Sequence, residues 1–253
     1  MSNKNQIKKY FFEHPLLWEE LSKKRFIVES FFLKKIFNKY GKVRNILDIG
    51  CATGSHLNEL SILGFTGLGI DLNKKMINFA KENYPALKFE VKDMRKINYK
   101  NKFDAIICLC SVFCYNVSNE DILSTLKSFH NSLKKGGILI IETFNPIEFL
   151  ENKKFERKNE ERKGYKKFGL KSISERYIDG IHQHMIEKRD IYRLKDFKKL
   201  KSDLTKFRLF FPQEMKYLLE TNGFKFQSFY GGYNLNDKNL NKFKLITVSK
   251  KKT

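Results

Sequence analysis

The stretch from Asn45 to Ser55 reads NILDIGCATGS. Residues 45–49 are short and apolar apart from Asp48, which is typical of a strand buried on both faces of a sheet. Gly50 and Gly54 follow, and glycine permits a tight turn and a close approach of the backbone to a ligand. Helical spacing resumes directly afterwards. Because open α/β sheets bind ligands at the carboxyl ends of their strands, the stretch predicts a ligand-binding loop in an α/β fold.

Strands and helices alternate on both sides of this loop. Further apolar strands are expected at Gly67–Ile70, Lys88–Val91, Ala105–Leu109 and Ile138–Ile141, with helices at Ser55–Leu63, Lys75–Asn83 and Ile122–Leu133. A helix that begins at Pro212 and strands at Phe224–Phe229 and Leu245–Val248 close the chain. This order predicts an α/β fold with a Rossmann-like, seven-stranded, mostly parallel sheet and flanking helices.

The pattern changes after Pro146. Apolar and polar residues alternate over Lys171–Ile178 and His182–Tyr192, and Asp179-Gly180 between them is a hairpin signal, so we expect a small antiparallel β insertion after the fifth strand. Four segments follow from this reading. They are an N-terminal helical lid (1–42), a cofactor-binding Rossmann-like core (43–146), an antiparallel substrate cap (147–210), and a C-terminal helix with the last two strands of the core (211–253).

The composition of the 253 residues is that of a globular protein. Hydrophobic residues make up 41% and aromatic residues 14%, which is enough for a packed interior and argues against wholesale disorder. No apolar run reaches the roughly 18 to 20 residues of a membrane span, and the lysine-rich start leads into no signal-peptide core. We therefore expect a soluble cytoplasmic protein, as a monomer or homodimer.

The four cysteines lack the spacing of a zinc site. Three of them, Cys108, Cys110 and Cys114, crowd one apolar stretch, and Cys51 lies in the glycine loop. We interpret all four as core or loop thiols, and no bound metal is expected.

The net charge of +22 raises nucleic acid as a partner, because lysine and arginine release counterions from phosphates. The excess, however, is mostly lysine spread along the whole chain. The densest runs, Lys153–Lys167 and Lys195–Lys206, also contain acids, which favours solvated helix or strand faces. A nucleic-acid partner therefore stays open but is not favoured.

Two carboxylates indicate which chemical groups the ligand of this loop carries. Asp48 beside the glycines would repel a dinucleotide pyrophosphate but suits a ligand that carries an ammonium group and a sulfonium. Asp71 ends the second strand about 20 residues after the loop, where an acidic side chain accepts hydrogen bonds from ribose hydroxyls. The alternative is a loop that merely turns a strand into a helix.

The pattern Asp-x-Gly-x-x-Thr-Gly from Asp48, followed by Asp71 and Asp93, resembles the class I S-adenosylmethionine-dependent methyltransferases over Val43–Glu142. The resemblance implies S-adenosyl-L-methionine as cofactor. It places Asp48, Gly50 and Gly54 around the methionine portion, Asp71 at the ribose, Asp93 with Met94 at the adenine, and Ser111 at the methionine end and the substrate. Ala52 and Leu72 are counted among the cofactor-binding residues, although Ala52 stands where many members have a third glycine.

A finer resemblance concerns the acceptor. Residues 103–108 and 111–115 look like the corresponding segments of the nucleotide-sugar amine N-methyltransferases and related small-molecule enzymes. Glu142 at the end of the fifth strand fits the pattern of these enzymes, whereas Thr143–Pro146 departs from it. The candidates for a catalytic pocket are Glu142, Tyr115 and His184. By period-two spacing His184 shares a strand face with His182. With Arg176 and Tyr177 across the hairpin, these residues would line either a polar pocket or a solvated sheet face.

The sequence therefore predicts a methyltransferase that carries a methyl group from S-adenosylmethionine to a nitrogen or oxygen of a small-molecule acceptor, amino sugar nucleotides included. Methylation of RNA or another macromolecule is the alternative that the charge leaves open. A non-catalytic S-adenosylmethionine-binding protein is a third. Tyr10, Phe11, Phe12 and Trp18 are expected to form an aromatic lid or to pack between helices.

Overall fold

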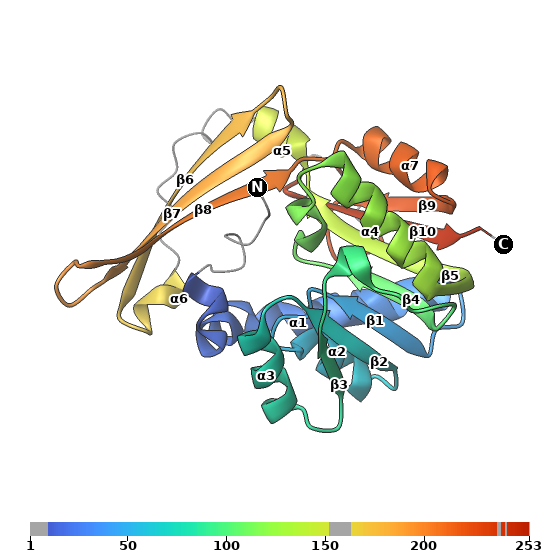
Figure 1. The fold of residues 1–253 in the computed structure, drawn as a ribbon, viewed down its shortest axis with the longest axis horizontal. Helices are drawn as coiled ribbons and strands as arrows, with labels where there is room; N and C mark the ends of the chain where they lie inside the picture. Colours follow the sequence, from blue (N-terminus) through green and yellow to red (C-terminus); the bar gives the residue numbers. More distant parts are fainter. Residues whose placement is uncertain (1–9, 152–162, 237–238, 241, 253) are drawn as a thin grey trace.

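In the computed structural model, which describes residues 10–151, 163–236, 239–240 and 242–252, seven strands form one sheet in the order β3-β2-β1-β4-β5-β10-β9 (Figure 1). The strands are β1 Asn45–Ile49, β2 Thr66–Asp71, β3 Lys88–Val91, β4 Phe103–Cys108, β5 Leu133–Phe144, β9 Phe224–Tyr230 and β10 Lys244–Lys251. Only β10 runs antiparallel to its neighbours. The predicted Rossmann-like fold is confirmed.

Helices cover both faces of this sheet. They are α1 Pro15–Tyr40, α2 Ser55–Ile62, α3 Lys74–Asn83, α4 Asn119–Ser132 and α7 Pro212–Thr221, with short turns η2 Tyr10–Phe12, η3 Met94–Lys96, η4 Val112–Tyr115, α5 Pro146–Glu151 and α6 Lys163–Lys166. The C-terminal half of α1 packs on one face, while α4 and α7 pack on the other. Within the described ranges no helix is long and apolar enough to span a membrane.

The insertion after β5 is a separate antiparallel sheet of three strands, β6 Leu170–Asp179, β7 His184–Arg193 and β8 Lys199–Arg208. Figure 1 shows it standing apart from the main sheet. The predicted insertion is confirmed, but its third strand was not foreseen. The basic run Lys195–Lys206 contains most of β8, whose buried Asp203 and Thr205 alternate with exposed positions. The other basic run, Lys153–Lys167, lies largely outside the described residues.

The polar pocket expected around His182 is not formed as predicted. His182 lies in the turn between β6 and β7, where its ring contacts the Asp179 carboxylate at 2.7 Å. Arg176 is buried, whereas Tyr177 is half exposed, because neighbouring residues of a strand point to opposite faces. The exposures of His182 and Tyr177 fit the alternative, a solvated sheet face. The strand begins two residues later than predicted, because the turn is longer than the Asp-Gly signal indicates.

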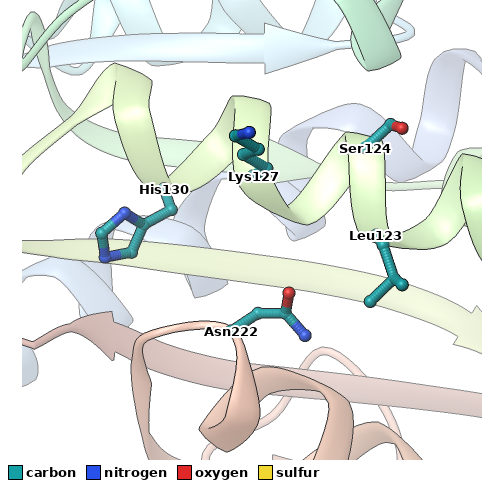
Figure 2. Close-up of a pocket in the computed structure, with 5 residues that line it drawn as sticks. All are labelled: Leu123, Ser124, Lys127, His130 and Asn222. Carbon is teal, nitrogen blue, oxygen red and sulfur yellow. The ribbon is translucent and has the colours of Figure 1, made fainter.

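A surface hollow lies between α4 and the turn that follows α7, and Figure 2 shows the five residues that line it. They are Leu123, Ser124, Lys127, His130 and Asn222. None of them belongs to the predicted site.

Candidate functional site

The glycine loop continues the pairing of β1 with β2 beyond the end of β1. The backbone N–H groups of Gly50 and Cys51 both donate to the carbonyl of Ile70, at 2.8 and 3.0 Å. Gly54 then begins α2 in a left-handed conformation with φ +84°. The loop is thereby fixed at the carboxyl edge of the sheet, where ligands of such folds bind.

Asp71 fixes this loop from the neighbouring strand. Its Oδ2 accepts the N–H of Ala52 at 3.0 Å, and its Oδ1 accepts the N–H of Asn73 at 2.8 Å. Ala52 has φ +48°, a region that glycine adopts without strain, so the backbone explains why the resembled family often has glycine here. Burial raises the pKa of Asp71, and these N–H groups oppose the rise. Its predicted contact with a ribose remains a prediction.

Replacement of Gly54 by alanine is expected to lower the free energy of unfolding by about 2–4 kcal/mol. A Cβ there would lie 2.6 Å from Cζ of Phe89, and the positive φ adds strain. Gly64→Ala is the matched control, since its φ is +93° but nothing lies within 4 Å of the added Cβ. The control should lose only about 1 kcal/mol in urea unfolding. Equal losses in the two variants would show that Gly54 is required for its backbone alone.

Asp48 is buried, with 2% of its surface exposed. By strand alternation it faces the same side as Ile46, which packs against α1. Its Oδ2 has no hydrogen-bond partner among the described residues. Burial raises the pKa of Asp48 to about 6; His56 opposes the rise and Asp71 adds to it. A buried carboxylate without a partner suits a cationic ligand group.

A second buried charge, of opposite sign, is that of Arg25 on α1. Its Nε and Nη2 atoms are buried, and no partner for them occurs in the described part of the chain. The guanidinium carbon lies 5.2 Å from the ring centroid of Trp18 and 5.5 Å from that of Phe26. Burial alone would lower the pKa of Arg25, but Cys110 and other nearby acidic groups raise it. Buried charges are normally paired, so this guanidinium has the character of an anion-binding group.

Glu142 at the end of β5 is held by three groups. Its Oε2 accepts the backbone N–H of Cys110 at 3.1 Å and the hydroxyl of Tyr233, and its Oε1 pairs with Lys244 at 3.1 Å. The side chain is almost fully buried. Both carboxylate oxygens are therefore engaged, and Oε2 holds the loop after β4.

The same network extends to α1 and α2. Lys244 also lies 3.5 Å from Glu29, whose other oxygen contacts His56. Glu29, His56 and Cys110 bring three possible metal-ligand atoms within 4.8 Å of one another. Burial raises the pKa of Cys110 to about 12, which disfavours the thiolate that binds metals, and Glu29 is already paired. The cluster is best described as a buried ion-pair network.

Two consecutive residues after β4 adopt left-handed conformations. Cys110 has φ +54° and Ser111 has φ +57°, and neither is glycine. Such backbone costs on the order of 1–3 kcal/mol per residue and tends to occur at functional sites. Ser111 is buried at this edge of the sheet, where the sequence predicted a contact with the cofactor.

The residues predicted at the adenine lie beyond β3. Asp93 accepts hydrogen bonds from Arg95, with Nε at 2.9 Å and Nη2 at 2.6 Å, so its carboxylate is already oriented. Met94 begins η3 and packs against the core, and Leu72 after β2 is 41% exposed. No contact among the described residues shows which ligand group Asp93, Met94 or Leu72 would bind.

The N-terminal segment lies across the glycine loop. Glu19 accepts hydrogen bonds from the hydroxyls of Thr53 and Ser55, and the carbonyl of Phe12 accepts one from Asn73 at 3.3 Å. Phe11 packs with Phe12 and Trp18, and the same cluster includes residues of α6 and the inserted sheet. The segment thus connects the loop to the insertion.

Tyr115 and His184 lie where the insertion meets the core. Tyr115 packs against Phe207 of β8, with ring centroids 5.1 Å apart. Burial raises the pKa of Tyr115 well above its usual range, and the nearby Glu187 adds to the rise, so the phenol stays neutral. His184 Nε2 lies 3.1 Å from the carbonyl of Val117, which can only accept, so Nε2 carries the proton and Nδ1 is the basic nitrogen.

Sequence reasoning missed Arg25, Glu29 and Lys244. None belongs to a motif, and a single charge in a lysine-rich chain carries no local signal. Their roles follow from contacts between α1, β5 and β10, which lie far apart in the sequence.

Comparison with known proteins gives consistent matches. Residues 41–200 match the family model described as "Methyltransferase domain". The chain is 33% identical over 110 residues to the putative methyltransferase YqeM of Bacillus subtilis, which covers 42% of this chain and 44% of that protein. It is 28% identical over 98 residues to dTDP-3-amino-3,4,6-trideoxy-alpha-D-glucopyranose N,N-dimethyltransferase of Streptomyces venezuelae, covering 39% and 41%. The chain thus matches less than half the length of either relative.

A solved structure resembles the whole fold. An S-adenosylmethionine-dependent methyltransferase from Clostridium acetobutylicum superposes with a TM-score of 0.79. The match covers 97% of this chain and 100% of that one, at 14% sequence identity. At this identity the likeness concerns the fold.

Proposed function

The chain belongs to the methyltransferase domain family, and on this premise we propose that it transfers a methyl group from S-adenosyl-L-methionine to a nitrogen or oxygen of a small molecule. The observation that carries the proposal is a pair of buried charges without partners in the described residues, the carboxylate of Asp48 and the guanidinium of Arg25. The amino-acid end of the cofactor carries an ammonium and a carboxylate. The ammonium is opposite in charge to the carboxylate of Asp48, and the ligand carboxylate is opposite in charge to the guanidinium of Arg25.

The other cofactor contacts follow from the loop. An added Cβ would clash with Val112 at Gly50 and with Phe89 at Gly54, so both positions require glycine. In this proposal their backbone lines the methionine portion together with Ala52 and Ser111. Asp71, with Leu72, would receive the ribose, and Asp93 with Met94 the adenine. The carboxylates of Asp71 and Asp93 are each oriented by backbone N–H groups, which suits hydrogen bonding to a ligand.

The residues near the acceptor have distinct roles in this proposal. The cofactor supplies a methyl group on a positively charged sulfur, open to in-line displacement. Tyr115, as a neutral phenol, orients the acceptor, and Glu142 holds the strained loop after β4. Nδ1 of His184 takes the proton of an acceptor that begins protonated. Much of the acceleration comes from holding the acceptor near attack distance.

The lid (1–42) and the cap (147–210) would close the site around a small acceptor. Glu19 and Phe12 attach α1 and its preceding turn to the loop, and Phe207 of β8 packs over Tyr115. The similarity to a sugar N,N-dimethyltransferase supports an amine acceptor. An amino sugar nucleotide is the specific acceptor we propose within this class.

Two measurements test the proposed function. The folded protein is expected to bind S-adenosylmethionine and S-adenosylhomocysteine with micromolar affinity in calorimetry. Label from the cofactor methyl group is expected in a small-metabolite extract rather than in total RNA, at near-physiological salt, where nonspecific adsorption through the +22 charge weakens. A folded protein that binds neither ligand contradicts the proposal. Label at one defined RNA nucleotide would instead support the macromolecular alternative.

A further inference from the structure

The buried face of the inserted sheet carries polar side chains next to apolar ones such as Met185 and Phe207. Alternation places Ser172 and Ser174 of β6 on this face together with Glu187 and Arg189 of β7, and all four are at most 4% exposed. We call these four residues, with Tyr165 of α6, the inner-face cluster. Burial of such groups is unfavourable unless each finds a partner, so the cluster calls for an explanation.

Charged side chains lie next to one another on this face. Glu187 accepts hydrogen bonds from two guanidinium groups. Arg176 Nε donates to its Oε1 at 2.8 Å, and Arg189 Nη2 donates to both of its carboxylate oxygens at 2.9 Å. Asp203 lies opposite Arg189 in the register, but it pairs with Lys201 at 3.5 Å. Arg189 thus lies between the carboxylates of Glu187 and Asp203 on this face.

Two buried hydroxyls of the cluster have no partner within the described ranges. They are Tyr165 Oη and Ser172 Oγ, and both side chains are 0% exposed. Tyr165 packs in one group with Ile191, and Ser172 lies opposite Ile191 in the register, two residues along the face from Arg189. Arg189 itself donates through Nε to Ser174 at 3.0 Å. The two unsatisfied hydroxyls thus lie on the same part of the face as the guanidinium of Arg189.

The cluster lies beside the proposed transfer site. Arg189 lies over the ring of Phe11, 5.5 Å from its centroid, and the next residue, Phe12, accepts a hydrogen bond from Asn73 beside Asp71. On the other side, Glu187 lies close enough to Tyr115 to raise the pKa of its phenol. A group bound here would therefore lie near Tyr115, in the turn that follows β4.

We propose that the inner-face cluster binds an anionic group of the methyl acceptor, a carboxylate or a phosphate, through the guanidinium of Arg189 and the hydroxyls of Tyr165 and Ser172. Both groups accept several charge-assisted hydrogen bonds, which is the chemistry that these donors offer. Burial of the cluster suits a small acceptor rather than a nucleic-acid backbone. The inference rests on the proposed function, because it names the class of acceptor for that reaction.

The test uses two small probes on the full chain saturated with S-adenosylhomocysteine. Trifluoroacetate observed by ¹⁹F NMR reports a carboxylate site, and methyl phosphate observed by ³¹P NMR reports a phosphate site. Saturable binding of one probe is expected at near-physiological salt, and Arg189→Gln should weaken it at least tenfold. Lys188→Gln is the matched control, because it removes the same charge from the exposed face of β7 and should leave the affinity unchanged.

Further variants keep the test decisive if Arg189→Gln does not fold. Tyr165→Phe and Ser172→Ala remove only the unpartnered hydroxyls, and each should weaken the same probe severalfold while unfolding at an unchanged or higher temperature. The inference is overturned if neither probe saturates the parent, or if Lys188→Gln loses as much affinity as the cluster variants. Binding of S-adenosylhomocysteine, measured on the same samples, separates this failure from failure of the proposed function.

Discussion

Replacement of Arg25 by glutamine is expected to weaken binding of S-adenosylhomocysteine about ten- to a hundredfold while leaving binding of 5′-methylthioadenosine unchanged. The first ligand carries the amino-acid group and the second lacks it. In the proposed complex the buried Nε and Nη2 of Arg25 hold the carboxylate, and a charge-assisted hydrogen bond of this kind is worth about 1.5–3 kcal/mol. Calorimetry with both ligands measures the difference.

The control for this experiment is on the same helix. Lys35→Gln removes an exposed positive charge from α1 and should change neither affinity. Arg25→Lys keeps the charge but removes the planar guanidinium that binds a carboxylate through two N–H groups, so an intermediate loss of affinity is expected. If Arg25→Gln weakened both ligands equally, the residue would support the fold or the adenosine end, and the assignment of the carboxylate would be wrong.

Replacement of Asp48 by asparagine is expected to stabilise the ligand-free protein and to weaken S-adenosylhomocysteine binding at least tenfold. A pKa raised from the usual 3.8 to about 6 corresponds to about 3 kcal/mol. Because the folded-state pKa lies above the unfolded one, this group's contribution to stability is full below pH 3.8 and is lost as the pH rises through 6. The gain in Asp48→Asn should therefore approach about 3 kcal/mol at pH 8 and shrink towards pH 5.

Urea unfolding of parent and variant at pH 5 and pH 8 measures this pH dependence. Asp104→Asn is a control for which the opposite change in stability is expected. Burial alone would raise the pKa of Asp104, but Lys134 at 2.7 Å and the N–H groups of Asn45 and Arg44 lower it. Asp104→Asn should therefore lose stability at pH 8. A destabilised Asp48→Asn at that pH would mean that the carboxylate already has a partner in the ligand-free protein.

The affinity of the parent for S-adenosylhomocysteine should also depend on the ionisation of Asp48. The ionised Asp48 is the form that receives an ammonium group, so affinity should fall as the pH drops below 6. 5′-Methylthioadenosine should show no such fall, since it lacks the ammonium. A pH-independent affinity for both ligands would argue against Asp48 as the ammonium site.

Local patterns in the sequence were enough to predict the main sheet. The apolar strands, the glycine loop and the acids at the strand ends follow short-range rules of periodicity and turn geometry, which need no knowledge of distant residues. The third strand of the insertion was missed because two of its leucines, Leu200 and Leu204, are exposed while Asp203 and Thr205 are buried, which reverses the usual alternation. His182 was misplaced because the length of a turn depends on how the two strands pair.

The sequence by itself determined the α/β fold class, the position of the ligand loop and the candidate acids Asp48 and Asp71, because these depend on neighbouring residues. Only the tertiary structure decided which charges are buried without a partner and which are neutralised. Arg25 and Asp48 belong to the first kind, whereas Glu142 is paired with Lys244 about 100 residues away. The physical reason is that burial and ion pairing arise from contacts between distant segments, and the free energy of a charge depends on those surroundings.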